Sequence, residues 1–301
     1  MKITILGSAA GLPTVDRGLP AIIVEVEGEL LLFDCGEGTQ RQLMRAGVSL
    51  CRKMRVFITH LHGDHLFGLP GLIQTMNLMN RVHPLGIFGP PGLKKFLEET
   101  TISTMPEPVF DLTVHEVKEG EIALGRQYRV IGALAEHSVP NIAYKLIAGE
   151  SSGKFNSNKA EALGIPEGPL RKDLKSGKPI TLEDGRHIDP ADVLGKPVRG
   201  ISMVYSGDTK PCSSVIKLAE DADLLIHEAT FTHDLGDRAS AEGHSTAEGA
   251  AGVAKSAKVK KLLLTHISAR YPDGKVLEDE AKNIFASSEV VEDLKNYDLK
   301  I

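Results

Sequence analysis

Three histidines and one aspartate stand within six consecutive positions, 60 to 65, directly after the apolar segment 56–58. Imidazole nitrogens and carboxylate oxygens are the donors that a borderline divalent metal such as Zn²⁺ prefers. A surface loop gains no structural stability from several histidines crowded beside an aspartate, so ordinary packing does not explain the cluster. The spacing of His60, His62, Asp64 and His65 therefore predicts a metal site at the end of a strand.

Three more residues of ligand type directly follow apolar, strand-like segments, and they are His137, Asp208 and His266. In layered α/β proteins, sites are generally built from residues at the carboxyl ends of several strands. The sequence therefore predicts an α/β fold in which separate strand ends supply ligands to one site.

Seven candidate ligands are too many for one Zn²⁺ ion, which takes about four, but they suit two ions that share a carboxylate. A carboxylate offers two oxygens, whereas one imidazole cannot bridge two ions, which makes Asp208 the natural shared ligand. Histidines two positions apart in an extended loop can face one ion, and the Asp-His pair that starts the next helix can face the other. We expect one ion on His60, His62 and His137, and the other on Asp64, His65 and His266.

A second pair of residues is a candidate for proton transfer. His244 precedes a predicted helix, and Glu228 follows the apolar segment 224–226. His244 is placed to protonate a leaving group, with Glu228 holding the imidazole in the required tautomer. The alternative for the segment 245–246 is a plain helix N-cap, because Ser and Thr are common there.

Composition limits the class of protein and the compartment in which it is expected. The chain has 301 residues and a net charge of −5, which does not indicate a broadly basic nucleic-acid-binding domain. Its three cysteines have no C-x-x-C spacing, so we expect free thiols in a reducing compartment. No apolar run reaches the roughly 18 residues of a membrane span, and the chain opens as an alternating strand rather than a signal peptide. We expect a cytoplasmic protein without a membrane partner.

Residues 149–200 differ in amino-acid composition from the rest of the chain. They are rich in glycine and proline, and residues 154–199 carry nine Lys or Arg against seven Asp or Glu, a local charge of +2. A floppy linker is the alternative, but linkers are normally poorer in Ile and Leu. We therefore predict one catalytic domain made of residues 1–148 and 201–301, with 149–200 as an inserted flexible arm.

Several segments resemble one known family. Residues 59–65 (THLHGDH) are similar to the metal-binding segment of the metallo-β-lactamase fold. Residues 68–72 (GLPGL) and 33–40 (FDCGEGTQ) narrow the resemblance to ribonuclease Z, the tRNA 3′-end endonuclease. Further matching segments, which extend the resemblance to nearly the whole chain, are 206–209, 227–231, 244–246 and 264–271.

The resemblance implies an α/β fold, a four-layer αββα sandwich with a protruding arm, and two Zn²⁺ ions per subunit on the seven ligands. It also implies cleavage of precursor tRNA by metal-activated attack of water on a phosphodiester, leaving a 3′-hydroxyl on the tRNA and a 5′-phosphate on the trailer. Asp64 corresponds to the proton acceptor for the attacking water. His and Asp ligands also accept Mn²⁺ or Fe²⁺, so the sequence does not identify the metal.

The resemblance further gives the arm a role as an exosite that grips the tRNA. Its Gly-Pro turn corresponds to Gly168 and Pro169, and its basic residues include Lys154, Arg171 and Lys172. The resemblance also implies a homodimer in which the arm of one subunit serves the active site of the other.

An N-terminal loop departs from the family pattern. Many members carry P-x-K-x-R-N, associated with sensing the CCA end, where residues 13–18 here read PTVDRG. Pro13 and Arg17 are kept, and Arg17 is a candidate substrate contact, but Val15 replaces the lysine and Gly18 the asparagine. The treatment of tRNA that ends in CCA is therefore left open.

Two other readings stay open at this stage. One is a different two-metal hydrolase of the same fold, such as a small-molecule phosphodiesterase or an arylsulfatase-like enzyme, because function belongs to the site rather than to the scaffold. The other is a non-catalytic, metal-dependent RNA-binding module. In a ribonuclease Z, deletion of residues 153–197 should abolish RNA cleavage and spare hydrolysis of a small phosphodiester. Undiminished cleavage by Asp64→Ala, with fold and metal retained, would argue against a catalytic role for this carboxylate.

Overall fold

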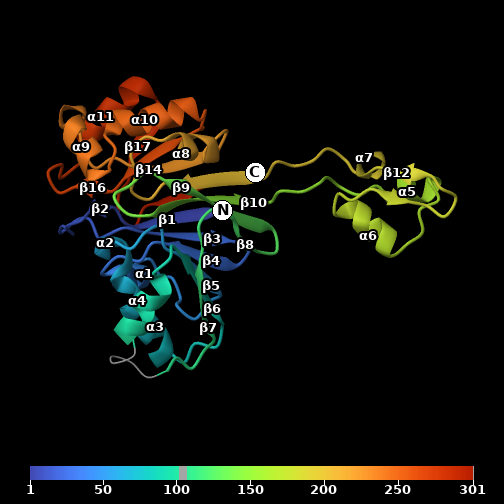
Figure 1. Ribbon diagram of the computed structural model, residues 1–301, viewed down its shortest axis with the longest axis horizontal. Coiled ribbons are helices and arrows are strands. Elements are labelled where there is room, and N and C mark those ends of the chain that lie inside the picture. The colour runs from blue at the N-terminus through green and yellow to red at the C-terminus, as the bar shows by residue number, and fades with distance from the viewer. Residues whose placement is uncertain (102–106, 301) are drawn as a thin grey trace. The chain divides into compact units, whose positions relative to one another are not determined.

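The computed structural model describes residues 1–101 and 107–300 (Figure 1). Seven strands form a first mixed sheet in the order β18-β1-β3-β4-β5-β6-β7. Strands β4 to β7 run parallel, so their carboxyl ends lie at one edge of the sheet. The strands of this sheet are β1 (Lys2–Gly7), β3 (Ala21–Val26), β4 (Glu29–Phe33), β5 (Met54–Phe57), β6 (Leu85–Gly89), β7 (Leu112–Glu116) and β18 (Asn296–Asp298).

A second mixed sheet also has seven strands, in the order β17-β15-β14-β13-β10-β9-β8. Strands β13, β14, β15 and β17 are parallel, whereas β8 and β9 are antiparallel. The strands are β8 (Gly120–Leu124), β9 (Tyr128–Ala135), β10 (Asn141–Ala148), β13 (Ile201–Tyr205), β14 (Leu224–Glu228), β15 (Leu262–Thr265) and β17 (Ser288–Val290). All five residues of β13 and of β14 are buried, as is usual for central strands that are covered on both faces.

Helices cover the outer face of each sheet (Figure 1). The first sheet packs against α1 (Thr39–Arg45), α3 (Gly68–Leu78) and α4 (Leu93–Thr101). The second packs against α8 (Ser213–Leu218), α10 (Ala247–Ser256) and α11 (Lys275–Ile284). Aromatic rings fill the space between the sheets, and they belong to Phe33, Phe57, Tyr144 and Tyr205. The predicted four-layer αββα sandwich is therefore confirmed.

Short elements shape the edge where the parallel strands end. Strand β2 (Ala9–Ala10) pairs in parallel with β16 (Ile267–Ser268), and α2 (Gly63–Leu66) follows β5 by a short loop. A 3₁₀ turn, η1 (His233–Leu235), leads into α9 (Gly236–Glu242) after β14. The three cysteines are free thiols. Among the described residues, no helix is both long and apolar enough to cross a bilayer.

Residues Ile147–Ile201 form a separate compact unit. It contains α5 (Ser157–Ala162), α6 (Pro169–Lys175), α7 (Pro190–Val193) and the hairpin of β11 (Ile180–Thr181) and β12 (His187–Ile188). The glycine and proline pattern does not predict these short elements. They enclose a small apolar core that includes Ile165, Leu174 and Val193. The other described residues make up the second unit. The predicted catalytic domain also includes residues 102–106 and 301, which lie outside the described residues.

Candidate metal centre

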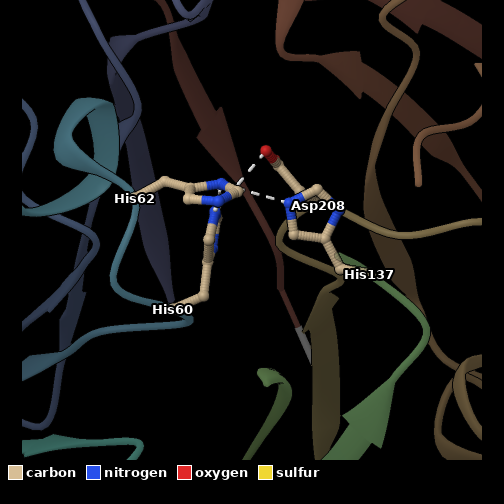
Figure 2. Close-up of side chains that lie close together, drawn as sticks. All are labelled: His60, His62, His137 and Asp208. Carbon is tan, nitrogen blue, oxygen red and sulfur yellow. Dashed lines mark hydrogen bonds and ion pairs between the residues drawn. The ribbon is translucent and has the colours of Figure 1, made fainter. Parts of the chain in front are cut away.

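The seven predicted ligands converge at the carboxyl ends of the strands. His60 and His62 follow β5, and Asp64 and His65 lie in the short helix α2. One ligand atom from each of His60, His62, His137 and Asp208 lies within 4.8 Å of the others, and the same holds for Asp64, His65 and His266. Figure 2 shows the side chains of His60 and His62 facing those of His137 and Asp208.

Asp208 lies between the two groups. Its Oδ2 is 3.7 Å from Nε2 of His60 in the first group. It is also 3.3 Å from Nε2 of His65 and 3.3 Å from Nε2 of His266 in the second. One carboxylate is therefore within reach of both groups, which is the arrangement that a shared ligand requires.

The first group is suited to neutral imidazoles. Burial, together with the nearby imidazole of His65, holds the pKa of His60 well below its usual value. Burial and the neighbouring His137 lower the pKa of His62 in the same direction. A neutral imidazole keeps the lone pair that a metal ligand needs. Nδ1 of His62 is 3.1 Å from Nε2 of His60 and 3.2 Å from Nε2 of His137, so these three nitrogens face one point.

The carboxylates of the cluster are ionised. Burial alone would raise the pKa of Asp208, but the imidazoles of His266 and His65 hold it well below its usual range. Burial also opposes ionisation of Asp64, and contacts with His266 and His65 outweigh it and lower its pKa. Oδ2 of Asp64 accepts a hydrogen bond of 3.1 Å from the backbone N–H of Gly11.

Two buried atoms in the cluster have no hydrogen-bond partner among the described residues. They are Nε2 of His65 and Oδ1 of Asp208. Buried polar atoms of this kind are rare in folded proteins, and a site for a bound ion is one accepted explanation. Because both atoms are metal-ligand types and lie in the same cluster, the residues present fit a pair of divalent cations.

Each histidine that presents Nε2 to the cluster has Nδ1 held by an oxygen. Nδ1 of His137 donates to the carbonyl oxygen of Gly243 at 2.7 Å. Nδ1 of His266 contacts the hydroxyl of Thr230 at 2.8 Å, and that hydroxyl itself donates to Glu228. Such partners fix the tautomer and orientation of a metal-binding histidine.

Asp34 does the same for His65, and sequence reasoning gave it no role of its own. Its Oδ2 lies 2.7 Å from Nδ1 of His65 and accepts a hydrogen bond of 2.8 Å from the hydroxyl of Tyr205. Its Oδ1 accepts one of 2.8 Å from the backbone N–H of Thr59. The available signal was its position, since Asp34 directly follows the apolar strand β4, as the predicted ligands follow theirs.

The predicted proton-transfer pair is in contact. Nδ1 of His244 is 2.8 Å from Oε1 of Glu228, which is fully buried. Although burial disfavours the imidazolium, the Glu228 carboxylate raises the pKa of His244 to about 9. Glu228 also accepts a hydrogen bond from the backbone N–H of Thr209. His244 lines a cavity of about 280 Å³ together with Asp64, so a protonated imidazole stands beside the ligand cluster.

The chain matches two family descriptions in parts. Residues 1–109 match the family described as anti-Pycsar protein Apyc1, and residues 173–267 match the β-lactamase superfamily domain. Over 300 residues, the chain is 45% identical to ribonuclease Z of Methanothermobacter thermautotrophicus, covering 100% of this chain and 97% of that protein. It is 42% identical over 301 residues to ribonuclease Z of Methanosarcina acetivorans, covering 99% and 98%.

The chain belongs to the ribonuclease Z family. A solved structure agrees, since the short form of human tRNase Z shares 30% sequence identity and a TM-score of 0.72, with 100% of both chains covered. The family and the fold expected from the sequence are therefore confirmed.

The residues that the ribonuclease Z resemblance assigns to RNA have different surroundings. Arg17 is only 8% exposed, and its Nη1 donates to the hydroxyl of Ser8 and to the carbonyl of Val291. Arg171 also has internal partners, because its guanidinium donates twice to the carbonyl of Ile165. Both guanidinium groups thus have partners within the chain, and their contact with RNA stays a prediction.

Two lysines and a turn of the inserted unit are open to solvent. Lys154, Lys172, Gly168 and Pro169 are all exposed. Gly168 precedes α6 with φ of 122°, a backbone conformation that favours glycine, and Pro169 occupies the first turn of that helix.

Proposed function

We propose that this chain is an endoribonuclease that removes the 3′ trailer from precursor tRNA by hydrolysing one phosphodiester bond. The observation that carries the proposal is the full-length similarity to ribonuclease Z proteins, at 45% identity with 100% of the chain covered. The clustered ligands supply the second requirement, a place for the metal ions that such a hydrolysis uses.

The proposed cofactor is a pair of Zn²⁺ ions. His60, His62 and His137 would hold one ion, Asp64, His65 and His266 the other, with Asp208 shared between them. When bound, such ions act as Lewis acids and lower the pKa of water towards about 7. The identity of the ions is tested by purifying the protein without added metal and comparing its content of Zn²⁺ with its contents of Mn²⁺ and Fe²⁺.

Asp64 and His244 would move the protons. The oxygen of water forms the new bond to phosphorus, and a proton of that water passes to the carboxylate of Asp64. The bond from phosphorus to the 3′-oxygen of the tRNA breaks, and that oxygen takes a proton from His244, which Glu228 orients through Nδ1. The products are a 3′-hydroxyl on the tRNA and a 5′-phosphate on the trailer.

Cleavage of a labelled precursor tRNA tests the activity directly. The wild-type protein should release a trailer with a 5′-phosphate, and Asp64→Ala should lose at least about a hundredfold in kcat while keeping its fold, as general acid–base groups contribute about 10²–10⁴-fold. Cleavage of a matched substrate that ends in CCA should be measured alongside, because the loop at residues 13–18 departs from the family pattern associated with sensing CCA. Undiminished cleavage by Asp64→Ala would remove the role proposed for this carboxylate.

The unit Ile147–Ile201 is the proposed tRNA exosite. Its exposed Lys154 and Lys172 suit contact with phosphates, which supply position rather than sequence recognition. Changing both lysines to glutamine should weaken cleavage of precursor tRNA more than hydrolysis of bis(p-nitrophenyl) phosphate. Deletion of residues 153–197 should have the same effect in stronger form, and equal loss on both substrates would contradict an exosite.

We also propose a homodimer in which the arm of one subunit serves the other's active site. Exposed apolar side chains on and beside α1 and α3 support an interface there, since Met44 is 56%, Phe67 63% and Leu78 76% exposed. Exposed apolar side chains of this size are candidates for a protein–protein contact. Mixing a subunit that lacks the arm with one that carries Asp64→Ala should restore activity if the arm acts across the dimer.

A further inference from the structure

The start of β10 lies beside the loop that carries the candidate shared ligand. Strand β10 begins at Asn141, shortly after the candidate ligand His137. In the second sheet β10 is next to β13, and β13 ends just before Asp208. The position of Asn141 therefore allows its side chain to act on the loop that presents Asp208.

The amide group of Asn141 donates two hydrogen bonds to that loop. Its Nδ2 donates to the carbonyl oxygen of Ser206 at 3.0 Å and to that of Asp208 at 2.8 Å. A carbonyl oxygen only accepts hydrogen bonds, so the group that faces both oxygens is the NH₂ group, and the orientation of the amide is fixed. The side chain is fully buried, where a carbonyl group that loses its donor is costly. Asn141 thus holds the backbone of Asp208 to β10.

Gly207 lets both carbonyl groups reach one amide. It lies between them with φ of 59°, the left-handed conformation that glycine adopts at little cost. A Cβ atom at this position would lie 2.6 Å from Oδ1 of Asn141 and 2.9 Å from Cβ of Thr59. The loop therefore packs closely against both residues, which leaves the backbone of Asp208 little room to move.

The next residue of β10 holds a second ligand segment. The backbone N–H of Ile142 donates to the carbonyl oxygen of Thr59 at 2.9 Å, and Thr59 directly precedes His60. Consecutive residues of one strand therefore hold the segments of His60 and Asp208. The distance of 3.7 Å between Nε2 of His60 and Oδ2 of Asp208 depends on this connection.

The carboxylate of Asp208 has few other contacts to position it. Among the described residues, its Oδ1 has no hydrogen-bond partner, and its Oδ2 pairs only with imidazole nitrogens. Its position before an ion binds is therefore set by its backbone. Asn141 holds that backbone on one side, and the hydrogen bond of 2.9 Å from the N–H of Thr209 to Glu228 holds it on the other.

We infer that Asn141 is a positioning residue that places the carboxylate of Asp208 within reach of both metal ions. The inference rests on the pair of ions in the proposed function. Residues that orient a single histidine, as Thr230 does for His266, act on a ligand of one ion. Asn141 acts on the shared ligand, so it controls the affinity of both sites.

Asn141→Asp removes the donor while keeping the shape of the side chain. An ionised carboxylate only accepts hydrogen bonds, so the two carbonyl groups lose their donor and the loop moves away. In titration of metal-free protein with Zn²⁺ against a chromophoric chelator, the affinity of both sites should fall about 10- to 100-fold. Asn141→Ala, which adds no charge, should also weaken both sites.

Asn77→Asp is the matched control. Asn77 is a buried asparagine of α3, a helix without candidate ligands, and its Oδ1 accepts from the backbone N–H of Val109 at 2.7 Å. Aspartate can accept the same bond, so both sites should keep wild-type affinity. Wild-type affinity in both Asn141 variants, or weakening of one site only, would overturn the inference. Loss of the fold of metal-free protein in both variants, seen by circular dichroism, would overturn it in favour of a structural role.

A double-mutant cycle tests whether Asn141 acts through Asp208. In Asp208→Asn each ion keeps three proposed ligands of its own, so residual binding can be measured with a weaker chelator. On that background Asn141→Asp should cause no further loss, because the shared carboxylate is already absent. The full loss on both backgrounds would overturn the proposed route. A wild-type protein that binds two ions but cuts no precursor tRNA would reject the proposed cleavage and leave this inference standing, whereas one that binds fewer than two ions would reject both.

Discussion

The carboxylate of Asp34 determines which nitrogen of His65 carries a proton. Asp34 is fully buried, and its Oδ2 lies 2.7 Å from Nδ1 of His65. A carboxylate only accepts hydrogen bonds, so Nδ1 keeps its hydrogen and Nε2 is the nitrogen left to face the cluster and bind a metal. Nε2 is the atom that lacks a hydrogen-bond partner and lies 3.3 Å from Asp208.

Asp34→Asn should reverse this arrangement. The amide oxygen can still accept from the backbone N–H of Thr59, which leaves the NH₂ group facing Nδ1 of His65. Nδ1 must then accept, the proton moves to Nε2, and Nε2 is no longer a ligand. We expect the affinity of the Asp64–His65–His266 site for Zn²⁺ to fall about 10- to 100-fold, about 1.4–2.7 kcal/mol. The isosteric change also removes one charge-assisted hydrogen bond, about 1.5–3 kcal/mol, which a stability of about 5–15 kcal/mol tolerates.

Titration of metal-free protein with Zn²⁺ against a competing chromophoric chelator measures both sites. In Asp34→Asn, one site should weaken and the other should keep its affinity, while circular dichroism shows a folded protein. The exposed Asp298 on β18 gives a control, and Asp298→Asn should bind both ions as the wild type does. Wild-type affinity at both sites of Asp34→Asn would refute the tautomer argument, and loss of fold would assign Asp34 a structural role instead.

Three further predictions concern stability and assembly. Hydrogen bonds from Lys261 and Lys295 outweigh partial burial and hold the pKa of Glu289 at about 2, so its stabilising effect should be present above about pH 4.5 and lost as the pH falls towards 2. Glu289→Gln should lower the free energy of unfolding by about 1 kcal/mol at pH 7, after allowance for solvent screening, and should reduce its pH dependence between about 4.5 and 2 in urea denaturation. An unchanged pH dependence would contradict the assignment. Arg81 is 1% exposed and donates to four backbone carbonyl groups. Arg81→Met should therefore lower the free energy of unfolding, measured by urea denaturation, by about 3–5 kcal/mol. A loss below about 1 kcal/mol would show that these carbonyl groups find other partners. Leu78→Asp should convert the proposed dimer to a monomer in light scattering without lowering Tm, and a persistent dimer would place the interface elsewhere.

The ligands were predictable from the sequence because their signal is local. His60, His137, Asp208 and His266 each follow an apolar strand within a few residues, and parallel strands bring such positions to one edge. The division into two groups also follows from local spacing, since the histidines of the loop and the Asp-His pair of α2 belong to different segments of secondary structure.

The residues that orient the ligands were not predictable in the same way. Gly243 supplies a backbone carbonyl to His137 from 106 positions away, and Thr230 contacts His266 across 36 positions. Neither contact leaves a local pattern, because a carbonyl group is present at every residue and a hydroxyl has many roles. Only the tertiary structure identifies them.

Charge was the least informative local signal. Arg17 and Arg171 are basic residues in segments expected to meet RNA, yet both donate to groups within their own unit. Whether a guanidinium faces solvent depends on acceptors that other segments provide.

The metal centre and the sandwich are specified by the same interior contacts. Asp34 directly follows β4 of the first sheet, and Tyr205, which donates to its Oδ2, is the last residue of β13 in the second. Through Asp34, the distance between the two sheets therefore affects the position of His65 and of the ligands beside it. Because Tyr205 also packs at the aromatic layer with Phe33, a core substitution that shifts this layer acts on the ligand geometry without touching a ligand. A site built this way loses metal affinity before the fold is lost, since a displacement of less than 1 Å disturbs coordination, whereas the apolar layers tolerate it.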